Sequence, residues 1–524
     1  MNREAFLQTI ITRREGWDIA VIGGGATGAG IAVDAASRGY RVVLLEQSDF
    51  GKGTSSRSTK LVHGGVRYLQ QGNIPLVMEA LKERGLLLQN APHLVRNLEF
   101  VVPNYQWWEA PFYGIGLKMY DLLAGKHGFG PSKILSHDEV LRRIPGLEPD
   151  GLRGGVVYHD GQFDDSRLLI NLLQTAVEQR ALVLNYARVT GLVKDAKGLV
   201  MGLTFRDEES GRVYTFGTRC IINATGPFCD QLRRLDDKTA SPMIAPSQGV
   251  HLVLPREFLP GDAAIMAPHT RDGRVMFAVP WNGHVVVGTT DTPVPAASLE
   301  PQPQEQEVDF ILHTASRYMA KSPARTDILS VFAGIRPLVK AKSASATAEL
   351  SRDHTIQVSG SGLLTIAGGK WTTYRKMAED AVNRAAELAS LPGEPCLTQF
   401  LPVHGFLEPP GNHGPLANYG SDAELIARLI REQPGLAAPL HESLPVCGAH
   451  IVWAVRHEMA RTLDDVLARR TRALFLNARA ALAMAPAAAR LLAIELGHDE
   501  NWQRLQLAAF KEIAAGFLPT FLSR

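Results

Sequence analysis

A dinucleotide-binding fingerprint near the N-terminus constrains the fold of this chain more than any other feature. Residues 17–28 join an apolar run, typical of a buried strand, to a helix pattern, through three glycines in the G-x-G-x-x-G spacing (Gly23, Gly25 and Gly28). The first glycine allows a tight turn, the second lets the backbone approach a pyrophosphate at the helix N-terminus, and the third lets helix and strand pack closely. A second strand is expected over 41–46. It ends on Glu46, whose carboxylate can accept hydrogen bonds from a ribose and would repel a 2′-phosphate, so the unit predicts a site for FAD or NAD rather than NADP.

Charge and cysteine content exclude several classes of function. The 524 residues suffice for two to four domains, and the 55 basic and 53 acidic residues nearly cancel. Nothing therefore points to nucleic acid, and an anionic substrate must be held by local charge. The four cysteines form no C-x-x-C pair, so we predict no disulfide, no metal site and a cytoplasmic setting. Residues 1–16 lack the apolar core of a secretory signal, and no apolar run is long enough to cross a bilayer, which leaves open that the chain lies on one.

The order of predicted elements is that of a split cofactor domain. A helix over 164–180, capped by Asp165 or Ser166, precedes a strand over 181–186. A β-meander over 189–216 follows, and then a buried strand over 219–223. This is the order of an α/β, Rossmann-like domain whose third strand comes after a large insertion.

Two other domains are expected beside it. Further strands after residue 245 predict a mixed β-sheet substrate domain, and helix formers after residue 448 predict a C-terminal α-helical domain. The expected division is an N-terminal extension (1–16), a cofactor domain (17–75, 151–230 and 351–391), a substrate domain (76–150 and 231–350), a linker (392–420) and the helical domain (421–524).

Two segments leave open whether they face the interior or a membrane. Residues 105–120 are unusually aromatic and include Trp107 and Trp108. This is typical of a packed core or domain interface or, alternatively, of a surface among lipid headgroups or beside a quinone. The basic segment 469–472 is typical of a solvated face, with contact to an anionic membrane surface as the alternative.

Two further glycine-rich elements favour a flavin over a nicotinamide. In residues 220–226, small side chains follow a buried strand and let the backbone pass close to a dinucleotide. In residues 363–374, a strand runs through Gly368 and Gly369 into a helix that begins near Thr372. A helix N-terminus directed at the pyrimidine end of an isoalloxazine would stabilise the negative charge of the reduced ring. The predicted cofactor is therefore FAD.

An ordered set of motifs over nearly the whole chain resembles the FAD-dependent, membrane-associated glycerol-3-phosphate dehydrogenase family, within the D-amino-acid-oxidase-like flavoproteins. Besides the fingerprint, the matching motifs are residues 54–56, 58–69, 223–227, 288–291, 334–338, 368–376, 456–459 and 462–472. The resemblance implies a split FAD-binding domain of the glutathione-reductase and D-amino-acid-oxidase type. No D-x-[DN]-x-[DN]-G loop of the kind that eukaryotic members append is present, which indicates a bacterial-type, calcium-independent form.

The resemblance also implies the reaction and its partners. Glycerol 3-phosphate is oxidised to dihydroxyacetone phosphate, and FAD passes the electrons to a membrane quinone. The protein is expected to associate peripherally with an anionic membrane surface, at the cytoplasmic face of the inner membrane. A homodimer is compatible with the sequence, which does not decide the oligomeric state.

Most of the expected substrate and catalytic residues lie in these motifs, and His251 and Arg352 lie outside them. A phosphate dianion calls for arginine, whose planar fork matches its oxygens. Arg336 lies in an apolar run where an unpaired charge is costly, so we predict it as the main phosphate ligand. The base that takes the proton of the C2 hydroxyl is expected to be His251 or His63, and Lys370 can instead stabilise the developing alkoxide. The other predicted substrate contacts are Arg67, Tyr68, Arg352 and Thr373.

The predicted FAD contacts come from separate parts of the chain that this fold brings together. They are Gly23, Gly25, Ala26, Thr27, Gly28, Glu46, Gln47, Thr54, Ser55, Ser56, Ser58, Thr59, Lys60, His63, Gly64, Val189, Ala224, Thr225, Gly226, Gly334, Gly368, Gly369, Lys370, Trp371 and Thr372.

Three alternative functions stay open at this point. A glycerol-3-phosphate oxidase of the same family would pass its electrons to oxygen and release peroxide. An amine or amino-acid oxidase of the same fold would need a clamp for a carboxylate in place of a phosphate site. A non-catalytic flavoprotein would hold FAD and show no reduction by any small alcohol.

Overall fold

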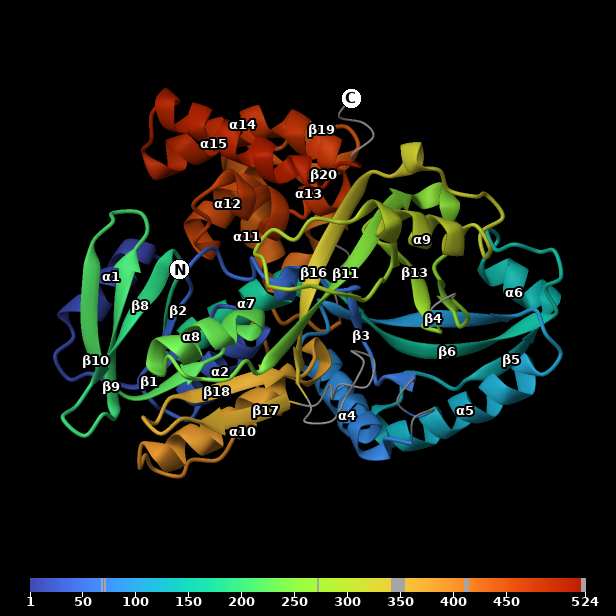
Figure 1. Cartoon of the computed structure of the whole chain (residues 1–524). Helices are drawn as coiled ribbons and strands as arrows, with labels where there is room; N and C mark the ends of the chain where they lie inside the picture. The colour runs from blue at the N-terminus through green and yellow to red at the C-terminus, as the bar shows by residue number, and fades with distance from the viewer. Residues whose placement is uncertain (67–68, 70–71, 271–272, 341–353, 410–413, 520–524) are drawn as a thin grey trace.

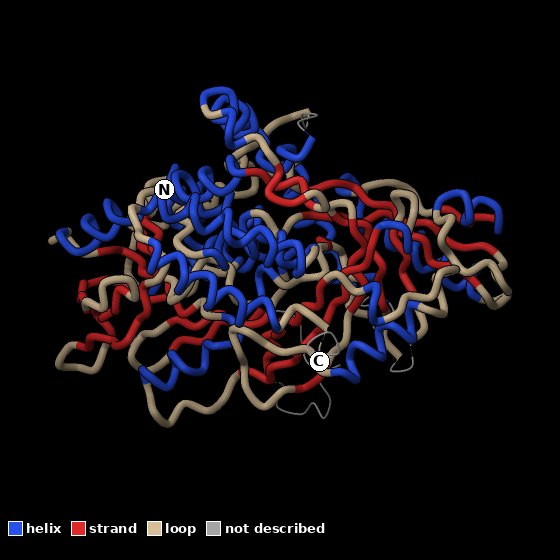
Figure 2. The backbone as a smooth tube through the Cα atoms, turned by 90° about the horizontal axis from the view of Figure 1, so that it is seen from above, coloured by secondary structure: helices blue, strands red, loops and turns tan. Residues whose placement is uncertain are grey.

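Two large β-sheets form the body of the molecule, and a group of helices packs across them (Figure 1). The computed structural model describes residues 1–66, 69, 72–270, 273–340, 354–409 and 414–519. Viewed from above, strand-rich regions occupy both ends of the molecule and helices lie between them (Figure 2).

The first sheet contains the fingerprint. Its strand order is β17-β18-β10-β1-β2-β7, and β1 pairs in parallel with both β2 and β10. All six residues of β1 are buried, as expected of a parallel strand covered on both faces. The strands of this order are β1 (Trp17–Ile22), β2 (Val42–Leu45), β7 (Leu182–Leu184), β10 (Val213–Asn223), β17 (His354–Val358) and β18 (Leu364–Gly368).

Three helices pack against this sheet in one hydrophobic cluster, namely α2 (Ala26–Ser37), α7 (Asp165–Glu178) and α10 (Tyr374–Leu388). The cap of α7 is Asp164, whose side chain accepts hydrogen bonds from the backbone N–H groups of Ser166 and Arg167. The expected cap at Asp165 or Ser166 is therefore wrong by one or two residues, and Asp165 has another role, described below.

The β-meander is attached to the same sheet. Strands β8 (Ala187–Lys194) and β9 (Val200–Asp207) pair with each other, and β9 pairs with the first half of β10. The second half of β10 turns to pair in parallel with β1, so the buried strand expected over 219–223 is the end of one long strand. The N-terminal residues form α1 (Arg3–Thr12), which is fixed by an ion pair of 2.5 Å between Arg3 and Asp207. A short helix, α8 (Cys229–Asp236), follows β10.

The second sheet has the order β15-β11-β14-β13-β12-β4-β6-β3, with β16 paired to β11 and β5 paired to β6. Strand β6 (Gly154–Phe163), which the sequence grouped with the cofactor segment 151–230, pairs with β4 in this sheet. The remaining strands are β3 (Leu61–Val62), β4 (Val95–Asn104), β5 (Lys133–Ser136), β11 (Ile244–Pro255), β12 (Ala264–Ala267), β13 (Met276–Trp281), β14 (His284–Gly288), β15 (Thr292–Pro293) and β16 (Ser330–Val339).

Alternation along these strands gives the second sheet two apolar faces. Phe100 and Val102 pack with helices α4 (Ile74–Asn90) and α5 (Glu109–Ala124). Val101 points to the opposite face and packs with α6 (His137–Arg143) and α9 (Glu305–Ala315), as the two-residue period of a strand requires. Helices α4 and α5 run along the lower edge of the molecule in Figure 1.

The C-terminal residues form mainly helices, at the top of Figure 1. They include a hairpin that the sequence did not indicate, and their apolar core is shared with Val253 and Phe332 of the second sheet. The elements are α11 (Ala423–Glu432), β19 (Pro439–His441), β20 (Leu444–Cys447), α12 (Gly448–Glu458), a π-helix, η10 (Asp465–Arg470), α13 (Ala473–Leu476), α14 (Ala478–Leu496) and α15 (Glu500–Ala515).

His404, in the segment between α10 and α11, binds this segment to α7 and makes the stability of the fold depend on pH. His404 contacts the carboxylates of Glu178, on α7, and Asp422, the latter at 2.8 Å. Burial alone would lower the pKa of His404, but the hydrogen bonds to Asp422 and Glu178 outweigh it and raise the pKa to about 9. In the unfolded chain the pKa is about 6.5. The stabilisation is therefore complete below pH 6.5 and is lost as the pH rises to 9.

We expect the protein to lose about 2–3 kcal/mol of unfolding free energy from this group between pH 6.5 and 9. The measurement is the thermal midpoint as a function of pH, for the parent protein and for His404→Gln. The variant should show a flatter alkaline limb, whereas His137→Gln, at an exposed histidine, should keep the parent profile. Parallel curves for His404→Gln and the parent would contradict the prediction.

Candidate cofactor and substrate site

A single cavity of about 980 Å³ runs from the fingerprint to the second sheet. Its walls come from the loop after β1, the segment 51–66, the ends of β10 and β18, and strands of the second sheet. The loops that follow parallel strands meet at one edge of a sheet, which is where such folds bind ligands. Segments far apart in the sequence therefore meet around one hollow.

Two positions of the fingerprint admit only glycine. Gly23 has φ +112°, and a Cβ there would lie 2.6 Å from the carbonyl oxygen of Ala224. A Cβ on Gly28 would lie 1.9 Å from the carbonyl oxygen of Gly23, so this glycine serves helix packing and does not line the cavity. The N-terminus of α2 opens on the cavity at Ala26 and Thr27, where its backbone N–H groups and dipole favour an anion.

Glu46 stands at the end of β2, in the wall of the same cavity. One carboxylate oxygen accepts a hydrogen bond of 2.7 Å from the backbone N–H of Gly24, and the other accepts one of 2.9 Å from Ser48. These two bonds fix the carboxylate and leave lone pairs for a further donor, such as a ribose hydroxyl.

The end of β18 and the loop after it, with Gly368 and Gly369, form a further wall of the same cavity. Gly369 has φ +73°, and a Cβ there would meet the sulfur of Met377 at 2.3 Å. Trp371 donates its indole N–H to the carbonyl of Ser55 at 2.8 Å, and Thr372 accepts a hydrogen bond of 3.1 Å from the backbone N–H of His63. These contacts join the loop after β18 to the segments before and after β3, so these walls of the cavity are fixed to each other.

Most of the residues predicted as cofactor contacts line this cavity. They are Gly23, Gly25, Ala26, Thr27, Glu46, Gln47, Thr54, Ser55, Ser58, Thr59, His63, Val189, Ala224, Thr225, Gly226, Gly334, Gly368, Gly369, Lys370, Trp371 and Thr372. The cavity thus has the glycine cradle, the helix N-terminus and the length that a dinucleotide requires.

Several predicted residues lie elsewhere. Besides Gly28, the residues that do not line the cavity are Ser56, Lys60, Gly64 and Thr373. Lys60 is fully buried, and its ammonium forms an ion pair of 2.7 Å with Asp165. Burial lowers the pKa of Lys60 to about 7, in spite of the pairing with Asp165. The predicted substrate contacts Arg67, Tyr68 and Arg352 lie outside the described residues.

Arg336 forms part of a pair of guanidinium groups in the substrate half of the cavity. Asp291 bridges the pair, at 3.1 Å from Arg336 and 3.1 Å from Arg274. All three residues line the cavity. Sequence reasoning missed Arg274, because it precedes a strand in a loop with no recognisable motif. Asp291 lay within the motif 288–291, which was a signal that it belongs to the site.

His251 lies in β11, where it is paired with Phe332 of β16, four residues before Arg336. Its Nε2 is 2.9 Å from the hydroxyl of Thr59, and its ring stacks on Phe332 with 4.8 Å between the centroids. Burial, reinforced by the charges of Lys60 and Arg336, holds the pKa of His251 well below its usual value of 6.5. The imidazole is therefore neutral near pH 7, and within the described part of the chain its Nδ1 has no hydrogen-bond partner. Such a group can accept a proton.

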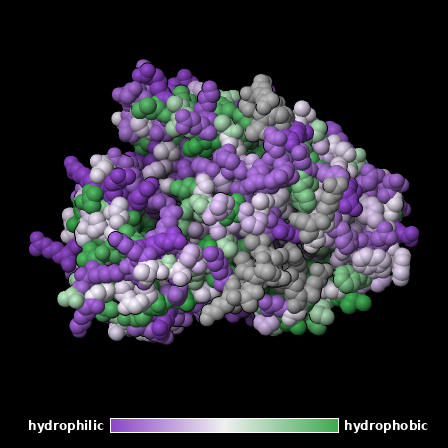
Figure 3. All heavy atoms as spheres, viewed as in Figure 1, coloured by the Kyte–Doolittle hydropathy of each residue, from purple (hydrophilic) through white to green (hydrophobic). Residues whose placement is uncertain are grey.

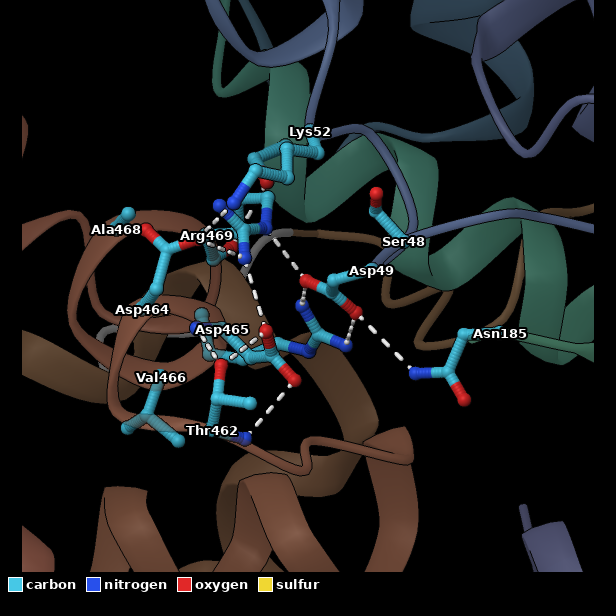
Figure 4. A network of polar contacts seen from close by, with 12 residues as sticks. Ser48, Asp49, Lys52, Asn185, Thr462, Asp464, Asp465, Val466, Ala468 and Arg469 are labelled. Carbon is cyan, nitrogen blue, oxygen red and sulfur yellow. Dashed lines mark hydrogen bonds and ion pairs between the residues drawn. The ribbon is translucent and has the colours of Figure 1, made fainter. Parts of the chain in front are cut away.

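A buried ionic network attaches the cofactor loop to the C-terminal helices (Figure 4). Asp49, just after Glu46, is in ion-pair contact with Arg469 at 2.5 Å and Arg470 at 2.8 Å. Both arginines come from the π-helix η10, and Arg469 also contacts Asp464 and Asp465 at 2.8 and 2.9 Å. The neighbouring Arg472 pairs with Asp165 at 3.1 Å.

The basic segment 469–472 is thus interior, and both expectations for it were wrong. Arg469, Arg470 and Arg472 are buried, so this segment is neither a solvated face nor a membrane contact. The acidic partners lie far away in the sequence or one helical turn upstream, which is why the run of positive charge suggested a surface.

The aromatic segment 105–120 has both an inner and an outer side. Tyr113 and Tyr120 are buried, whereas Trp107 is 76% exposed and Phe112 is 53% exposed. Trp108, Phe112 and Tyr113 line the cavity at the end remote from the fingerprint. The cavity therefore reaches the outer surface at α5.

The comparisons with known proteins agree with this geometry. A family model described as FAD dependent oxidoreductase matches residues 18–375, and one described as the C-terminal domain of alpha-glycerophosphate oxidase matches residues 364–503. The chain is 41% identical over 549 residues to the mitochondrial glycerol-3-phosphate dehydrogenase SDP6 of Arabidopsis thaliana. The alignment covers 97% of this chain and 86% of that protein. It is 40% identical to the mitochondrial glycerol-3-phosphate dehydrogenase of Rattus norvegicus, over 99% of this chain and 75% of that one.

Solved structures give the same picture. The glycerol-3-phosphate dehydrogenase of Bacillus halodurans, complexed with FAD, superposes with a TM-score of 0.80 at 29% identity and covers 99% of this chain and 98% of its own. The FAD-bound L-alpha-glycerophosphate oxidase of Mycoplasma pneumoniae, at 18% identity and a TM-score of 0.56, covers 73% of this chain and 97% of its own and shares the fold. The predicted FAD-binding α/β fold with a mixed-sheet domain and a C-terminal helical domain is confirmed.

Proposed function

The chain belongs to the FAD-dependent glycerol-3-phosphate dehydrogenases, and from this premise we propose that it oxidises sn-glycerol 3-phosphate to dihydroxyacetone phosphate and passes the electrons to a membrane quinone. The observation that carries the proposal is the meeting, in one cavity, of a dinucleotide cradle, two guanidinium groups and a neutral histidine.

The cofactor is FAD, and the residues that hold it are those of the fingerprint, Glu46 and the loop 368–372. Bound there, FAD supplies the acceptor for a hydride from C2 of the substrate. The N-terminus of α2 would stabilise its pyrophosphate charge. With FAD bound, backbone N–H groups of the turn at 371–373 before α10 would stabilise the negative charge of the reduced ring.

Arg336 and Arg274 bind the substrate phosphate in this proposal. The two guanidinium groups lie on either side of Asp291 in the cavity wall, and their planar forks match the oxygens of a phosphate dianion. Lys370, also in the cavity wall, supplies a further positive charge beside the developing alkoxide. Arg67, Tyr68 and Arg352 remain predictions for the same site.

His251 takes the proton of the C2 hydroxyl. Loss of a hydride from C2 and of a proton from its oxygen converts the alcohol to a ketone, so the balance requires one base. A neutral imidazole satisfies that need near pH 7, and the Thr59 hydroxyl at 2.9 Å orients the ring. His63 lines the same cavity and is the second candidate for the base.

The acceptor is tested with the reduced protein. We expect anaerobic glycerol 3-phosphate to reduce the bound flavin, ubiquinone-1 to reoxidise it within seconds, and air to reoxidise it much more slowly with little peroxide. Rapid reoxidation by air with stoichiometric peroxide, and none by quinone, would instead identify a glycerol-3-phosphate oxidase.

Helix α5 supplies a surface suited to a membrane. Its outer side carries apolar residues three or four positions apart, which place them on one face. Ile115 is 69% exposed and Leu122 is 80% exposed, and hydrophobic atoms lie at the lower right edge of Figure 3, where α5 and β5 are found in Figure 1. The exposed large apolar residues of α4, of residues 107–122 and of β5 are Ile74, Met78, Trp107, Trp108, Phe112, Ile115, Met119, Leu122 and Ile134.

Exposed lysines surround this face, as an anionic lipid surface requires. They are Lys82, Lys118, Lys126 and Lys133. No helix in the described part of the chain is long and apolar enough to span a bilayer. We therefore propose that the protein binds peripherally through α5, at the cytoplasmic face of the inner membrane.

Charge placed on the outer face of α5 is expected to weaken binding to anionic vesicles. The double variant Ile115→Glu with Leu122→Glu should lower the affinity for anionic phospholipid vesicles by at least about tenfold, because it removes two apolar contacts with the bilayer, each of about 1.5–3 kcal/mol. Cosedimentation with the vesicles measures the affinity. The matched control is Ile494→Glu, at an equally exposed isoleucine of α14, which should bind as the parent does. Equal binding by the double variant would contradict the role of α5.

A further inference from the structure

We propose that the end of the cavity beside α5 is the docking site of the quinone headgroup, with His269 and Tyr113 as its polar contacts. This inference rests on the proposed function and names the site at which its electron acceptor binds. We define the aromatic mouth as the five cavity-lining residues Phe100, Trp108, Phe112, Tyr113 and Phe277.

A row of residues across the second sheet connects the aromatic mouth to the site of substrate oxidation. His251 pairs with Gly288 of β14, and Gly288 pairs with Phe277 of β13. Phe277 pairs with Met266 of β12 and makes an edge contact with Phe100, with 5.9 Å between the rings. Directly paired residues point to the same face of a sheet, and His251, Met266, Phe100 and Phe277 all line the cavity.

The character of the cavity changes along this row. Near His251 it is lined by guanidinium and hydroxyl groups, whereas beyond Phe277 it is lined by aromatic rings and by the thioether of Met266. A flat, apolar ring with polar atoms at its edge fits such a pocket, which is the usual composition of a small-molecule site. None of the five residues of the mouth is charged, whereas Arg274 and Arg336, which would bind the phosphate, are held together at Asp291.

The aromatic mouth is continuous with the face proposed to meet the membrane. Trp108 and Phe112 line the cavity and are also 40% and 53% exposed on the outer side of α5. They stand edge to face, with 6.0 Å between their rings. A hydrophobic quinone can therefore pass from the bilayer into the cavity without crossing water, which is the property that commits the mouth to this ligand.

Three polar groups lie at the mouth in a fixed arrangement. Glu109 is buried, and one of its carboxylate oxygens accepts hydrogen bonds from the backbone N–H groups of Tyr105 and Gln106 at 2.7 and 2.8 Å. The other oxygen contacts Nε2 of His269 at 2.9 Å, and the phenol of Tyr113 lies 3.3 Å from the same nitrogen. Glu109 thereby positions the imidazole, which is half-exposed and lines the cavity.

These groups suit the chemistry of quinone reduction. Conversion of a quinone to a quinol takes up two electrons and two protons, the same number that oxidation of the secondary alcohol releases, so no other reductant is needed. Burial raises the pKa of the Tyr113 phenol to about 12, with a contribution from Glu109, so the phenol stays protonated and donates a hydrogen bond to a quinone oxygen. His269 passes a proton to the bound quinone and regains one from solvent.

The test separates the two half-reactions. Phe112→Ala, Tyr113→Phe and His269→Gln are made in the holoprotein, and stopped-flow absorbance follows flavin reduction by glycerol 3-phosphate and then its reoxidation by ubiquinone-1. We expect reoxidation by ubiquinone-1 to slow at least tenfold in each variant, with flavin content and the reduction rate unchanged. The control Phe400→Ala, at an aromatic residue that is 75% exposed and outside the cavity wall, should change neither rate.

Photolabelling measures quinone binding independently of the kinetics. An azido-quinone should label the tryptic peptide Asn97–Lys118, which carries four of the five mouth residues, and excess ubiquinone-1 should suppress the label. Parent-like reoxidation in all three variants, label elsewhere, or slower reduction by glycerol 3-phosphate would each overturn the assignment of the mouth. If no quinone reoxidises the parent protein itself, the proposed acceptor fails, and this outcome is distinct from failure of the site alone.

Discussion

Replacing Arg336 by alanine is expected to lower kcat/KM for glycerol 3-phosphate by about 100- to 1,000-fold, since each hydrogen bond to a charged group contributes about 1.5–3 kcal/mol. Most of the loss should appear as a higher KM, because the phosphate is bound equally in the ground and transition states. The guanidinium lies in the cavity wall and shares Asp291 with Arg274. Arg336→Lys should recover part of the affinity, because it keeps the charge and loses the planar fork.

Steady-state kinetics with a quinone acceptor give both parameters, and the flavin-to-protein absorbance ratio shows whether the cofactor site is intact. Arg317→Ala, at an exposed arginine of the same domain, should leave kcat and KM unchanged. An Arg336→Ala protein with a parental KM would remove the phosphate role of this residue.

Replacing Asp49 by asparagine is expected to cost about 3–5 kcal/mol of unfolding free energy, the usual result when a buried ion-pair network loses one partner. The Asp49 carboxylate accepts hydrogen bonds from Arg469 at 2.5 Å and from Arg470 at 2.8 and 2.9 Å. Burial alone would raise the pKa of Asp49, but the two guanidinium groups hold it below its usual value. Asparagine has no charge to offset the two guanidinium groups. Its amide N–H group would also face the guanidinium N–H groups, which are donors themselves.

The Asp49→Asn substitution should also lower the amount of bound FAD. Asp49 lies three residues after Glu46 in the cofactor loop, and its partners come from η10 of the C-terminal helices. The fraction of protein purified with FAD should therefore fall together with the urea midpoint. Glu387→Gln breaks an exposed ion pair with Arg384 and should change stability by at most about 1 kcal/mol. A parental midpoint in Asp49→Asn would contradict the structural role of the network.

Local signals were sufficient to predict the dinucleotide-binding fold and the cofactor. A glycine that must accept φ +112°, as Gly23 does, and a helix that starts directly after a buried strand are properties of short segments. These properties can therefore be predicted without knowing which other segments pack nearby. The same is true of the strands of the meander and of α7, apart from its cap.

Properties that depend on distant partners were not predictable in the same way. Whether Arg469 faces water or the interior is decided by Asp49, 420 residues away, and no pattern near residue 469 contains that information. Arg274 reaches the site because β13 and β11 lie on either side of β14 in one sheet. Strand β6 reads like part of the cofactor segment that follows it, and only its pairing with β4 assigns it to the second sheet.

The reaction itself can be tested in one anaerobic titration. Purified protein with bound flavin is mixed in turn with glycerol 3-phosphate, glycerol, lactate and D-amino acids, and the flavin absorbance is followed. We expect bleaching by glycerol 3-phosphate at stoichiometric concentration, with none by the other compounds in the same time. A protein that carries no flavin, or one that glycerol or amino acids bleach as readily, would contradict the assignment of this cavity to the oxidation of a phosphorylated alcohol.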